Sequence, residues 1–525
     1  MTTRRLILHA LMLLLPLTVF HLNAEVVLNS TELGECWGVG ACTAPNNGFQ
    51  IFYGIGDDPY TAEQKDSIFD YLFLNSGANC GFTNIRHEML CYHTDSTRGE
   101  REWMQTHEPE NDEWNWGADS CQMWFLGEAM ERHSNYFLHT CPWSPPVWMK
   151  SDGSETKGGK LIDGLEEELA EYFVVFLNKY KNDYDITFNA LSIQNEPNFS
   201  PPWASCEYNA SDFDRVVPVI HAMMDDSGLS DVLLGAPNHG KTSGSYDMLN
   251  SMSDSTKELL DWIPTNDYTV FEENTDLTVF GKPVMVTEIQ YKNSRMGPQD
   301  QVAAKFVKRF NRGENGMDYW RYIRVADDDD ENAREGLVGV NLDATIIKTK
   351  MSAYLGVLSR AMRNGNTLLA TTNTIEGVNS CGSRTDDGRK RLVVASYDST
   401  DYTDQSVTGF DANDSIMVLR SNWDGTEHIA QKPTIVTDET GSFTTHIPRR
   451  TITAFISLGT EGSVKTFPRK QKSVRENQFH GPMKTQGRFD VMGRSLQILD
   501  DGTTDRAKAV SVEVKRDAKK RVTVE

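Results

Sequence analysis

Two glutamates each follow a short apolar run that has the pattern of a buried β-strand. Glu196 stands near the end of FNALSIQNEP (188–197), and Glu288 near the end of PVMVTEIQ (283–290). One carboxyl group can donate a proton while another attacks or activates water, so a facing pair can cleave a glycosidic bond. A single glutamate at a strand end can equally serve a structural ion pair, and this alternative stays open for each residue. Their chemistry therefore depends on whether the fold brings the two side chains together.

The segment 48–362 alternates strand-like runs with amphipathic stretches. Thr61 and Gln64 have the spacing of a capping box at the start of one helix. A second helix is expected at 166–181, where acids come first and lysines last, and a third begins at the cap Ser211 and ends at Gly228. The strand-like runs lie at 82–89, 135–143, 188–197, 232–238, 283–290 and 317–324. This alternation over about 300 residues predicts the α/β class with a parallel sheet, and its length favours a (β/α)8 barrel.

The barrel prediction gives the two glutamates a common location. They are 92 residues apart, which is three units at about 30 residues per βα unit. The carboxyl ends of all eight strands open onto one face of such a barrel, where catalytic groups lie. We therefore expect Glu196 and Glu288 to face each other across the barrel mouth.

The segments on either side of 48–362 have different sequence patterns. Residues 363–458 contain β-runs separated by Asp, Gly and Ser turns and predict a β-sandwich. Residues 25–47 are expected to add an N-terminal strand to it, or else to plug the barrel bottom. The segment 459–525 is expected to be a linker and a basic C-terminal extension, since 461–525 holds 15 Lys and Arg against 9 Asp and Glu. Its RFDVMGRSL stretch is similar to the sorting tails of type IX export.

The first 24 residues are expected to be a signal peptide. Arg4 and Arg5 precede an apolar run at 6–20, which is shorter than the roughly 20 residues that span a bilayer, and the small Ala24 precedes the expected cleavage site. An uncleaved N-terminal anchor is the alternative. No later run is long enough to span, so a secreted or cell-surface protein is expected.

Composition narrows the class of partner. The chain has 525 residues, a net charge of −23 and 10% aromatic residues. This charge argues against nucleic acid as a partner. The aromatic supply suits stacking on the apolar faces of sugars, although most aromatic side chains simply pack in cores.

The sequence carries no cofactor motif. It lacks a GxGxxG after a strand, a GxxxxGK[ST] loop, and any zinc spacing of Cys and His. The DDDDE run at 327–331 is expected to be a solvated loop, with calcium binding as the alternative. We therefore expect neither a metal nor an organic cofactor. Among the eight cysteines, Cys36 with Cys42 and Cys80 with Cys91 are candidate disulfides, with buried free thiols as the alternative.

Three motifs give the chain a resemblance to glycoside hydrolase family 30. WSPPVWMKSDG (143–153), LSIQNEP (191–197) and VTE (286–288) occur in the family's order and spacing, within a match from about 25 to 457. The resemblance implies a (β/α)8 barrel with an attached β-sandwich. It also implies an O-glycosyl hydrolase with a retaining, double-displacement mechanism and no cofactor.

The same resemblance assigns roles to individual residues. Glu196 matches the general acid/base and Glu288 the nucleophile. Asn195 matches the residue that binds the sugar 2-hydroxyl, and Arg86 an arginine beside the nucleophile. Trp143 matches an aromatic wall of the sugar site. For Arg86 the alternative is a structural ion pair, and for the tryptophan it is core packing.

The chain departs from the family in two places. The usual glycine-rich run near the first strand is here GFQIFYGIGDD (48–58), and the end of the sixth strand is TNDY (265–268). Tyr268 can still orient the nucleophile, while Asn266 would replace the family histidine.

The eighth strand guides the choice of substrate. WRYIRV (320–325) resembles the corresponding segment of glucuronoxylan-cutting members. Trp320 is then a sugar platform, and Tyr322 and Arg324 are candidates for binding the uronate, because an arginine offers a carboxylate two parallel hydrogen bonds. This favours an endo-β-1,4-xylanase of the glucuronoxylanase type, acting as a monomer on a polysaccharide or oligosaccharide.

Other substrates and classes stay open. The segment 115–130 resembles β-1,6-galactanase-type members, so an endo-β-1,6-galactanase or β-1,6-glucanase is an alternative, as is a glucosylceramidase. The alternative outside enzymes is a catalytically silent polysaccharide-binding protein on the same fold.

Overall fold

The computed structural model describes residues 25–44, 60–92, 106–268, 275–290, 299–325, 335–341 and 343–459. All of them belong to one compact unit of the chain. The predicted signal peptide, the run at 48–58, the acidic loop at 327–331 and the tail beyond residue 459 lie outside the described residues.

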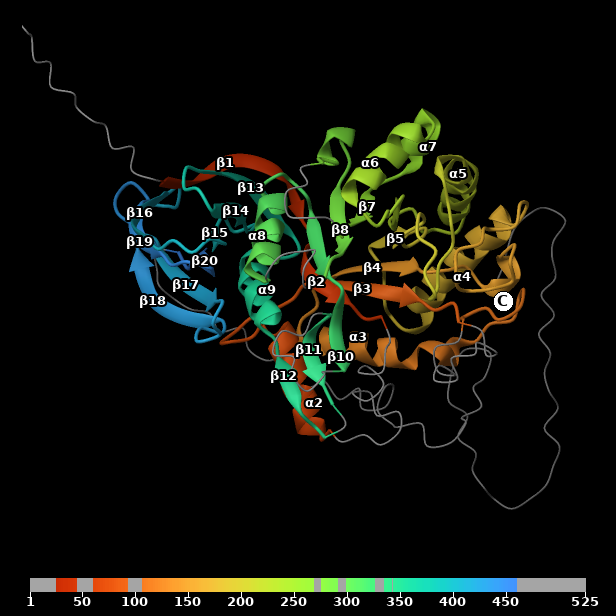
Figure 1. Ribbon diagram of the computed structural model, residues 1–525, viewed down its shortest axis with the longest axis horizontal. Helices are drawn as coiled ribbons and strands as arrows, with labels where there is room; N and C mark the ends of the chain where they lie inside the picture. Colours follow the sequence, from red (N-terminus) through yellow and green to blue (C-terminus); the bar gives the residue numbers. More distant parts are fainter. Residues whose placement is uncertain are drawn as a thin grey trace, which may run out of the picture. The chain divides into compact units, whose positions relative to one another are not determined.

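Eight parallel strands form the barrel sheet, in the order β6-β5-β4-β3-β2-β9-β8-β7. A parallel bridge between Gly235 and Trp262 joins its two edges and closes the ring. Only glycine fits at position 235, because a Cβ there would lie 2.3 Å from the indole nitrogen of Trp262. The predicted (β/α)8 barrel is confirmed (Figure 1). Its strands are β2 (Gly38–Cys42), β3 (Asn84–Met89), β4 (Phe137–Pro142), β5 (Ala190–Ser192), β6 (Leu233–Gly235), β7 (Ile263–Asn266), β8 (Val284–Glu288) and β9 (Gly316–Tyr319).

The helices begin where local capping signals place them. Thr61 and Gln64 form both hydrogen bonds of the predicted capping box at the start of α2. The predicted cap of α5 is wrong by two residues, because Asn209 caps this helix and forms a capping box with Asp212. The helices are α2 (Ala62–Phe73), α3 (Ser120–Arg132), α4 (Glu166–Asp183), α5 (Ala210–Asp226), α6 (Thr242–Ser251), α7 (Asp254–Leu259), α8 (Gln299–Phe310) and α9 (Lys350–Ala361), with short 3-10 turns η2 (Trp116–Asp119), η3 (Val147–Met149) and η4 (Thr278–Phe280).

The predicted β-sandwich is a nine-stranded mixed sheet, in the order β18-β17-β20-β15-β14-β13-β1-β16-β19. The N-terminal strand β1 pairs antiparallel with β13 and parallel with β16, so it belongs to this sheet and does not plug the barrel. The strands are β1 (Glu25–Cys36), β13 (Asn366–Asn373), β14 (Val378–Arg384), β15 (Lys390–Ser396), β16 (Tyr402–Thr408), β17 (Ser415–Asn422), β18 (Ala430–Val436), β19 (Phe443–Ile447) and β20 (Thr451–Ser457).

Helices α8 and α9 join the barrel to the sandwich (Figure 1). Arg450, just before β20, pairs with Asp300 of α8 at 2.8 Å. Its carbonyl oxygen accepts a hydrogen bond from the Tyr354 hydroxyl of α9 at 2.6 Å. Asn379 of β14 also donates to the Ala304 carbonyl oxygen of α8 at 3.0 Å, so several polar bonds join the two layers.

Two segments differ from the expected boundaries. The first barrel strand, β2, lies within the segment 25–47 that was expected to serve only the sandwich, so the barrel begins before residue 48. The run 317–324 is not one strand, because it breaks at Trp320. Its second half, β10 (Arg321–Val325), leaves the barrel and pairs with β11 (Gly336–Val340), which in turn pairs with β12 (Ile346–Lys348).

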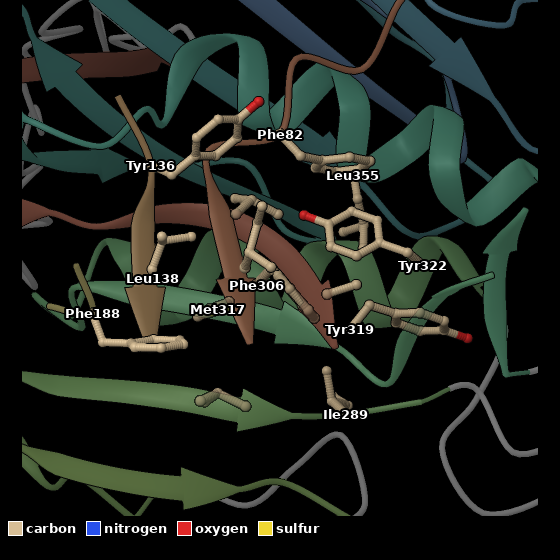
Figure 2. Close-up of a cluster of buried hydrophobic side chains, with 14 of the residues drawn as sticks. Phe82, Tyr136, Leu138, Phe188, Ile289, Phe306, Met317, Tyr319, Tyr322 and Leu355 are labelled. Carbon is tan, nitrogen blue, oxygen red and sulfur yellow. The ribbon is translucent and has the colours of Figure 1, made fainter. Parts of the chain in front are cut away.

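The main core fills the barrel and the layer between its strands and helices. Figure 2 shows a part of this cluster, in which side chains from β4, β9, β10 and α9 converge. In the part of the chain described here, no helix has the length and apolarity needed to cross a membrane.

Candidate active site

Arg86 and Glu288 meet at the carboxyl-terminal mouth of the barrel. Arg86 lies on β3 and Glu288 is the last residue of β8. One guanidinium nitrogen, Nη1, donates to Glu288 Oε2 at 2.6 Å and to the carbonyl oxygen of Thr287 at 3.0 Å. The other, Nη2, donates to Asn195 Oδ1 at 2.7 Å. One side chain therefore ties three strand ends together.

This arginine keeps its charge although it is fully buried. Burial by itself lowers the pKa of Arg86, but the neighbouring carboxylate of Glu288 outweighs that cost and the pKa is raised overall. A buried guanidinium of this kind is stable only while its acceptors are in place. Glu288 is thus held in a fixed orientation at the end of β8.

Glu196 follows β5 in a strained backbone conformation. Its φ is +42°, a value that residues other than glycine rarely adopt. The backbone N–H donates to the carbonyl oxygen of Asn238 at 3.0 Å, which holds the turn. Gly240 passes so close that a Cβ there would lie 2.8 Å from Glu196 Oε1. Such strain persists only where surrounding structure enforces it, and here the result is a carboxyl group turned into the mouth beside the backbone of Gly240.

Tyr268 contacts the same carboxylate from the other side. Its hydroxyl donates to Glu288 Oε1. Burial and then the negative charges of Glu288 and Glu196 raise the pKa of Tyr268, so the phenol stays protonated and remains a donor. The Tyr268 backbone N–H donates to the Gly240 carbonyl oxygen at 3.3 Å, and Gly240 lies against the Glu196 carboxyl, so both predicted carboxylates lie around Tyr268.

Asn195 and Asn266 form an amide relay beside this site. Asn195 Oδ1 accepts from Arg86 Nη2 and from Asn266 Nδ2, the second at 3.2 Å. Asn266 Oδ1 in turn accepts from the Thr287 hydroxyl at 2.9 Å. Because Oδ1 accepts two hydrogen bonds, the orientation of the Asn195 amide is fixed, and its Nδ2 can donate to another acceptor. Asn266 therefore orients Asn195.

Two tryptophans line the mouth. The guanidinium carbon of Arg86 lies 4.6 Å from the Trp143 ring centroid, and Trp143 lies 5.9 Å from Trp320. Trp143 is buried and Trp320 is half-buried. Their rings are part of a small apolar cluster that also contains Ala204. The structure therefore places both predicted tryptophans with Arg86.

The uronate assignment of Tyr322 is wrong. Tyr322 is completely buried in the core cluster (Figure 2). Its ring centroid lies 5.3 Å from that of Phe73 and 5.2 Å from that of Phe125, and its hydroxyl donates to the Asn84 carbonyl oxygen at 2.5 Å. The physical reason is the break at Trp320, which turns β10 beneath helices α2 and α3. Arg324 lies on the same strand, only 7% exposed, with its stem against Gly336 of β11.

The candidate disulfides are also wrong. All eight cysteines are free thiols, and all are buried. Burial raises the pKa of Cys36 and of Cys80 to about 12, so both are protonated and inert. In the part of the chain that the structure describes, no group of three or more Cys, His, Asp or Glu is arranged to hold a metal ion.

A buried His–Asp pair beneath the mouth went unpredicted. His139 Nε2 on β4 lies 2.6 Å from Asp318 Oδ2 on β9, and neither side chain is exposed. Burial raises the pKa of Asp318 and lowers that of His139. Both residues interrupt otherwise apolar strand runs, which was the one local signal that could have identified them. Gly240 and Asn238, which shape the turn at Glu196, gave no such signal.

Comparisons with known proteins agree with this architecture. The catalytic domain of a family 30 xylanase C from Talaromyces cellulolyticus superposes with a TM-score of 0.64 at 18% identity, covering 82% of this chain and 99% of the other. An endo-β1,6-glucanase superposes with a TM-score of 0.65 at 18% identity, covering 82% and 93%. At these identities the similarity establishes the fold, and the predicted family 30 type of barrel and sandwich is confirmed.

Sequence comparison adds relatives and a family. An endo-1,6-β-D-glucanase from Neurospora crassa is 27% identical over 146 residues, which cover 26% of this chain and 28% of that protein. The chain spans less than a third of the length of the curated relatives it matches. The model of glycosyl hydrolase family 59 matches residues 57–341, more than half of the chain and most of the barrel. The chain therefore belongs to glycosyl hydrolase family 59, and it has the barrel-and-sandwich fold of the family 30 structures.

Proposed function

We propose that this protein is a retaining endo-β-1,6-glucanase. The observation that carries the proposal is the fixed set around Glu288, in which Arg86 and Tyr268 bind its two carboxylate oxygens while Arg86 also binds Asn195. A carboxylate held this firmly, with the Glu196 carboxyl nearby beside Gly240, suits a nucleophile paired with a general acid.

The chemistry runs in two displacements. Glu288 attacks the anomeric carbon while Glu196 donates its proton to the leaving oxygen, so one C–O bond forms as the other breaks. Glu196, now ionised, takes a proton from water, whose oxygen displaces Glu288 and releases the sugar. The anomeric configuration is retained after the second inversion.

The neighbours of the carboxylates have separate tasks. Arg86 and Tyr268 keep Glu288 oriented toward the anomeric carbon. Within the described residues nothing accepts a hydrogen bond from Asn195 Nδ2, so this group is available to donate to the sugar 2-hydroxyl. That bond strengthens as positive charge develops at the anomeric carbon. Trp143 and Trp320 offer aromatic surface to the ring.

The expected substrate is β-1,6-glucan and not xylan. The xylan preference rested on Tyr322 and Arg324, and Tyr322 is part of the core. The curated relatives are endo-1,6-β-D-glucanases, and the net charge of −23 suits a neutral polymer better than an anionic one. We place the enzyme outside the cell, where the signal-like segment 1–24 would direct it, as a monomer that needs no cofactor.

The test is product sizing on a panel of polymers. The mature chain is incubated with linear β-1,6-glucan, β-1,6-galactan, glucuronoxylan and arabinoxylan, and the anomer formed first is read by NMR. The variant Glu288→Gln should lose at least about 10⁴-fold in rate. The matched control Glu131→Gln, whose side chain is 51% exposed on α3, should retain full rate.

The outcomes separate the alternatives. Gluco-oligosaccharides of several lengths with retained configuration, absent for Glu288→Gln, support the proposal. Uronate-bearing oligosaccharides from glucuronoxylan would restore the xylanase, and galacto-oligosaccharides would indicate a galactanase. An inverted product would exclude double displacement. Binding without cleavage of any polymer would indicate a polysaccharide-binding protein.

A further inference from the structure

Two aromatic side chains are exposed on the loop that follows Glu196. Phe199 is 44% exposed and Trp203 is 41% exposed, and their ring centroids lie 5.9 Å apart at 68°. Among the described residues, the other large apolar side chains this exposed are Ile162, Val279 and Val436, and none of these is aromatic. An exposed pair of rings forms a surface that water solvates poorly, which marks it for a ligand.

This pair is attached directly to the candidate acid/base. The Phe199 backbone N–H donates to the carbonyl oxygen of Glu196 at 3.0 Å, so the turn that carries the carboxyl also carries the ring. At the other end of the loop, Ala204 is buried in the cluster with Trp143 and Trp320. The loop that carries the two rings is therefore attached to the site at both ends, at Glu196 and at the cluster of Trp143 and Trp320.

The loop is held rigidly by a second segment, 155–159. The Lys157 N–H donates to the Pro201 carbonyl oxygen at 2.9 Å, and Thr156 bridges Ala204. The buried ammonium of Lys150 donates to the carbonyl oxygens of both Gly158 and Ser205, one from each segment. A surface fixed in this way loses little conformational entropy when it binds.

The position of the rings selects the part of the substrate they meet. Glu196 protonates the leaving oxygen, so the leaving portion of the polymer must pass next to Glu196. Arg86 holds Glu288 and Asn195 by hydrogen bonds, and the sugar that is attacked must sit against Glu288. The apolar face of a pyranose stacks on an aromatic ring, so exposed rings beyond Glu196 match the sugars of the leaving portion.

We infer that Phe199 and Trp203 form a stacking platform for the leaving-group sugars of a glucan chain. This inference rests on the proposed glycosidase role of Glu196 and adds to it the reason for cutting within a chain. A platform on the leaving side binds substrates more tightly when they have several sugars beyond the scissile bond. It therefore favours internal cleavage over release of terminal sugars.

The test compares two substrates in Phe199→Ala, Trp203→Ala and the double variant. One is linear β-1,6-glucan, which reaches the platform, and the other is an aryl β-glucoside, whose leaving group carries no sugar. Each substitution should lower kcat/KM on the polymer about two- to tenfold, mainly through KM, and leave the aryl glucoside rate within about twofold. Because the rings are exposed, the melting temperature should not change. Val279→Ala, an exposed apolar residue on η4, should change neither rate.

Equal losses on both substrates would overturn the inference, and so would an unchanged polymer rate in the double variant. If the enzyme cuts a different polymer, the proposed substrate fails, but the same comparison on that polymer still decides the platform. If no polymer is cut, affinity electrophoresis of Glu288→Gln with and without Trp203→Ala in β-1,6-glucan decides it. Unchanged mobility there would count against the platform.

Discussion

Replacing Arg86 by methionine tests the central feature of the site, the coupling between Arg86 and Glu288. The substitution keeps an unbranched apolar stem and removes the guanidinium. Glu288 Oε2, Asn195 Oδ1 and the Thr287 carbonyl oxygen each lose a donor. The Glu288 carboxylate then stays at a position where its side chain is only 6% exposed, without its cation.

The magnitude follows from this burial. Removing one partner of a buried ion pair costs about 3–5 kcal/mol of unfolding free energy, which we expect for Arg86→Met. Glu288→Gln keeps an acceptor for the guanidinium and should cost about 1–3 kcal/mol. The double variant no longer buries an unpaired charge, so its cost should fall below the sum of the single costs by about 1–3 kcal/mol.

Urea unfolding of the four proteins measures the cycle, with fluorescence and circular dichroism required to report the same transition. The pair Arg321 and Glu335 is the control, because its atoms also lie 2.6 Å apart but the glutamate is 40% exposed. That exposed pair should show a coupling below about 1 kcal/mol. Additive costs at Arg86 and Glu288, within about 0.5 kcal/mol, would refute the view that they form one unit.

Three further variants probe single features of the structure. Gly240→Ala should displace the Glu196 carboxyl and lower kcat about tenfold or more with little loss of stability. The control is Gly127→Ala on α3, where an added Cβ contacts nothing, and it should leave kcat unchanged. An equal kcat in the two variants would contradict the close approach of Gly240 to Glu196. Tyr322→Phe should cost about 1–3 kcal/mol of stability by calorimetry and leave kcat/KM unchanged on every polymer, because its hydroxyl binds buried backbone groups. A loss of activity confined to glucuronoxylan would restore the uronate role. Burial raises the pKa of Glu108 from 4.5 to about 8, so between these pH values the folded state holds a proton that the unfolded state has released. The free energy of unfolding should therefore fall as the pH rises from about 4.5 to about 8, by at most about 1.4 kcal/mol per pH unit. Glu108→Gln should flatten that decline in thermal unfolding scans, and a decline of the same slope in the variant would show that another group causes it.

Several features could be predicted because they depend on neighbours in sequence. The capping box of Thr61 and Gln64 acts within one helical turn, and it is present as expected. The end of β8 at Glu288 was visible because the apolar run stops there, whereas β5 ends at Ser192, four residues before Glu196. The cap of α5 was missed because Asn209 and Ser211 are both good caps, and only the packing of the helix decides which residue begins it.

Features that depend on pairing between distant segments could not be predicted. The residues 317–324 have a strand pattern throughout, and nothing local shows that β9 pairs with β8 while β10 pairs with β11. That change of partner buries Tyr322 and removes the uronate site. The cysteines are similar, since their spacing allowed disulfides, whereas all eight are free thiols in the folded chain.

By itself, the sequence determined the alternation that builds a barrel and the placement of Glu196 and Glu288 at its strand ends. These follow from periodicity and from the rule that parallel strands open their carboxyl ends onto one face. Only the tertiary structure decided that Arg86 joins Glu288 to Asn195, that Asn266 fixes the Asn195 amide, and that Tyr322 is core. Such contacts join residues about 70 to 240 positions apart, and their geometry exists only after the chain has closed into a barrel.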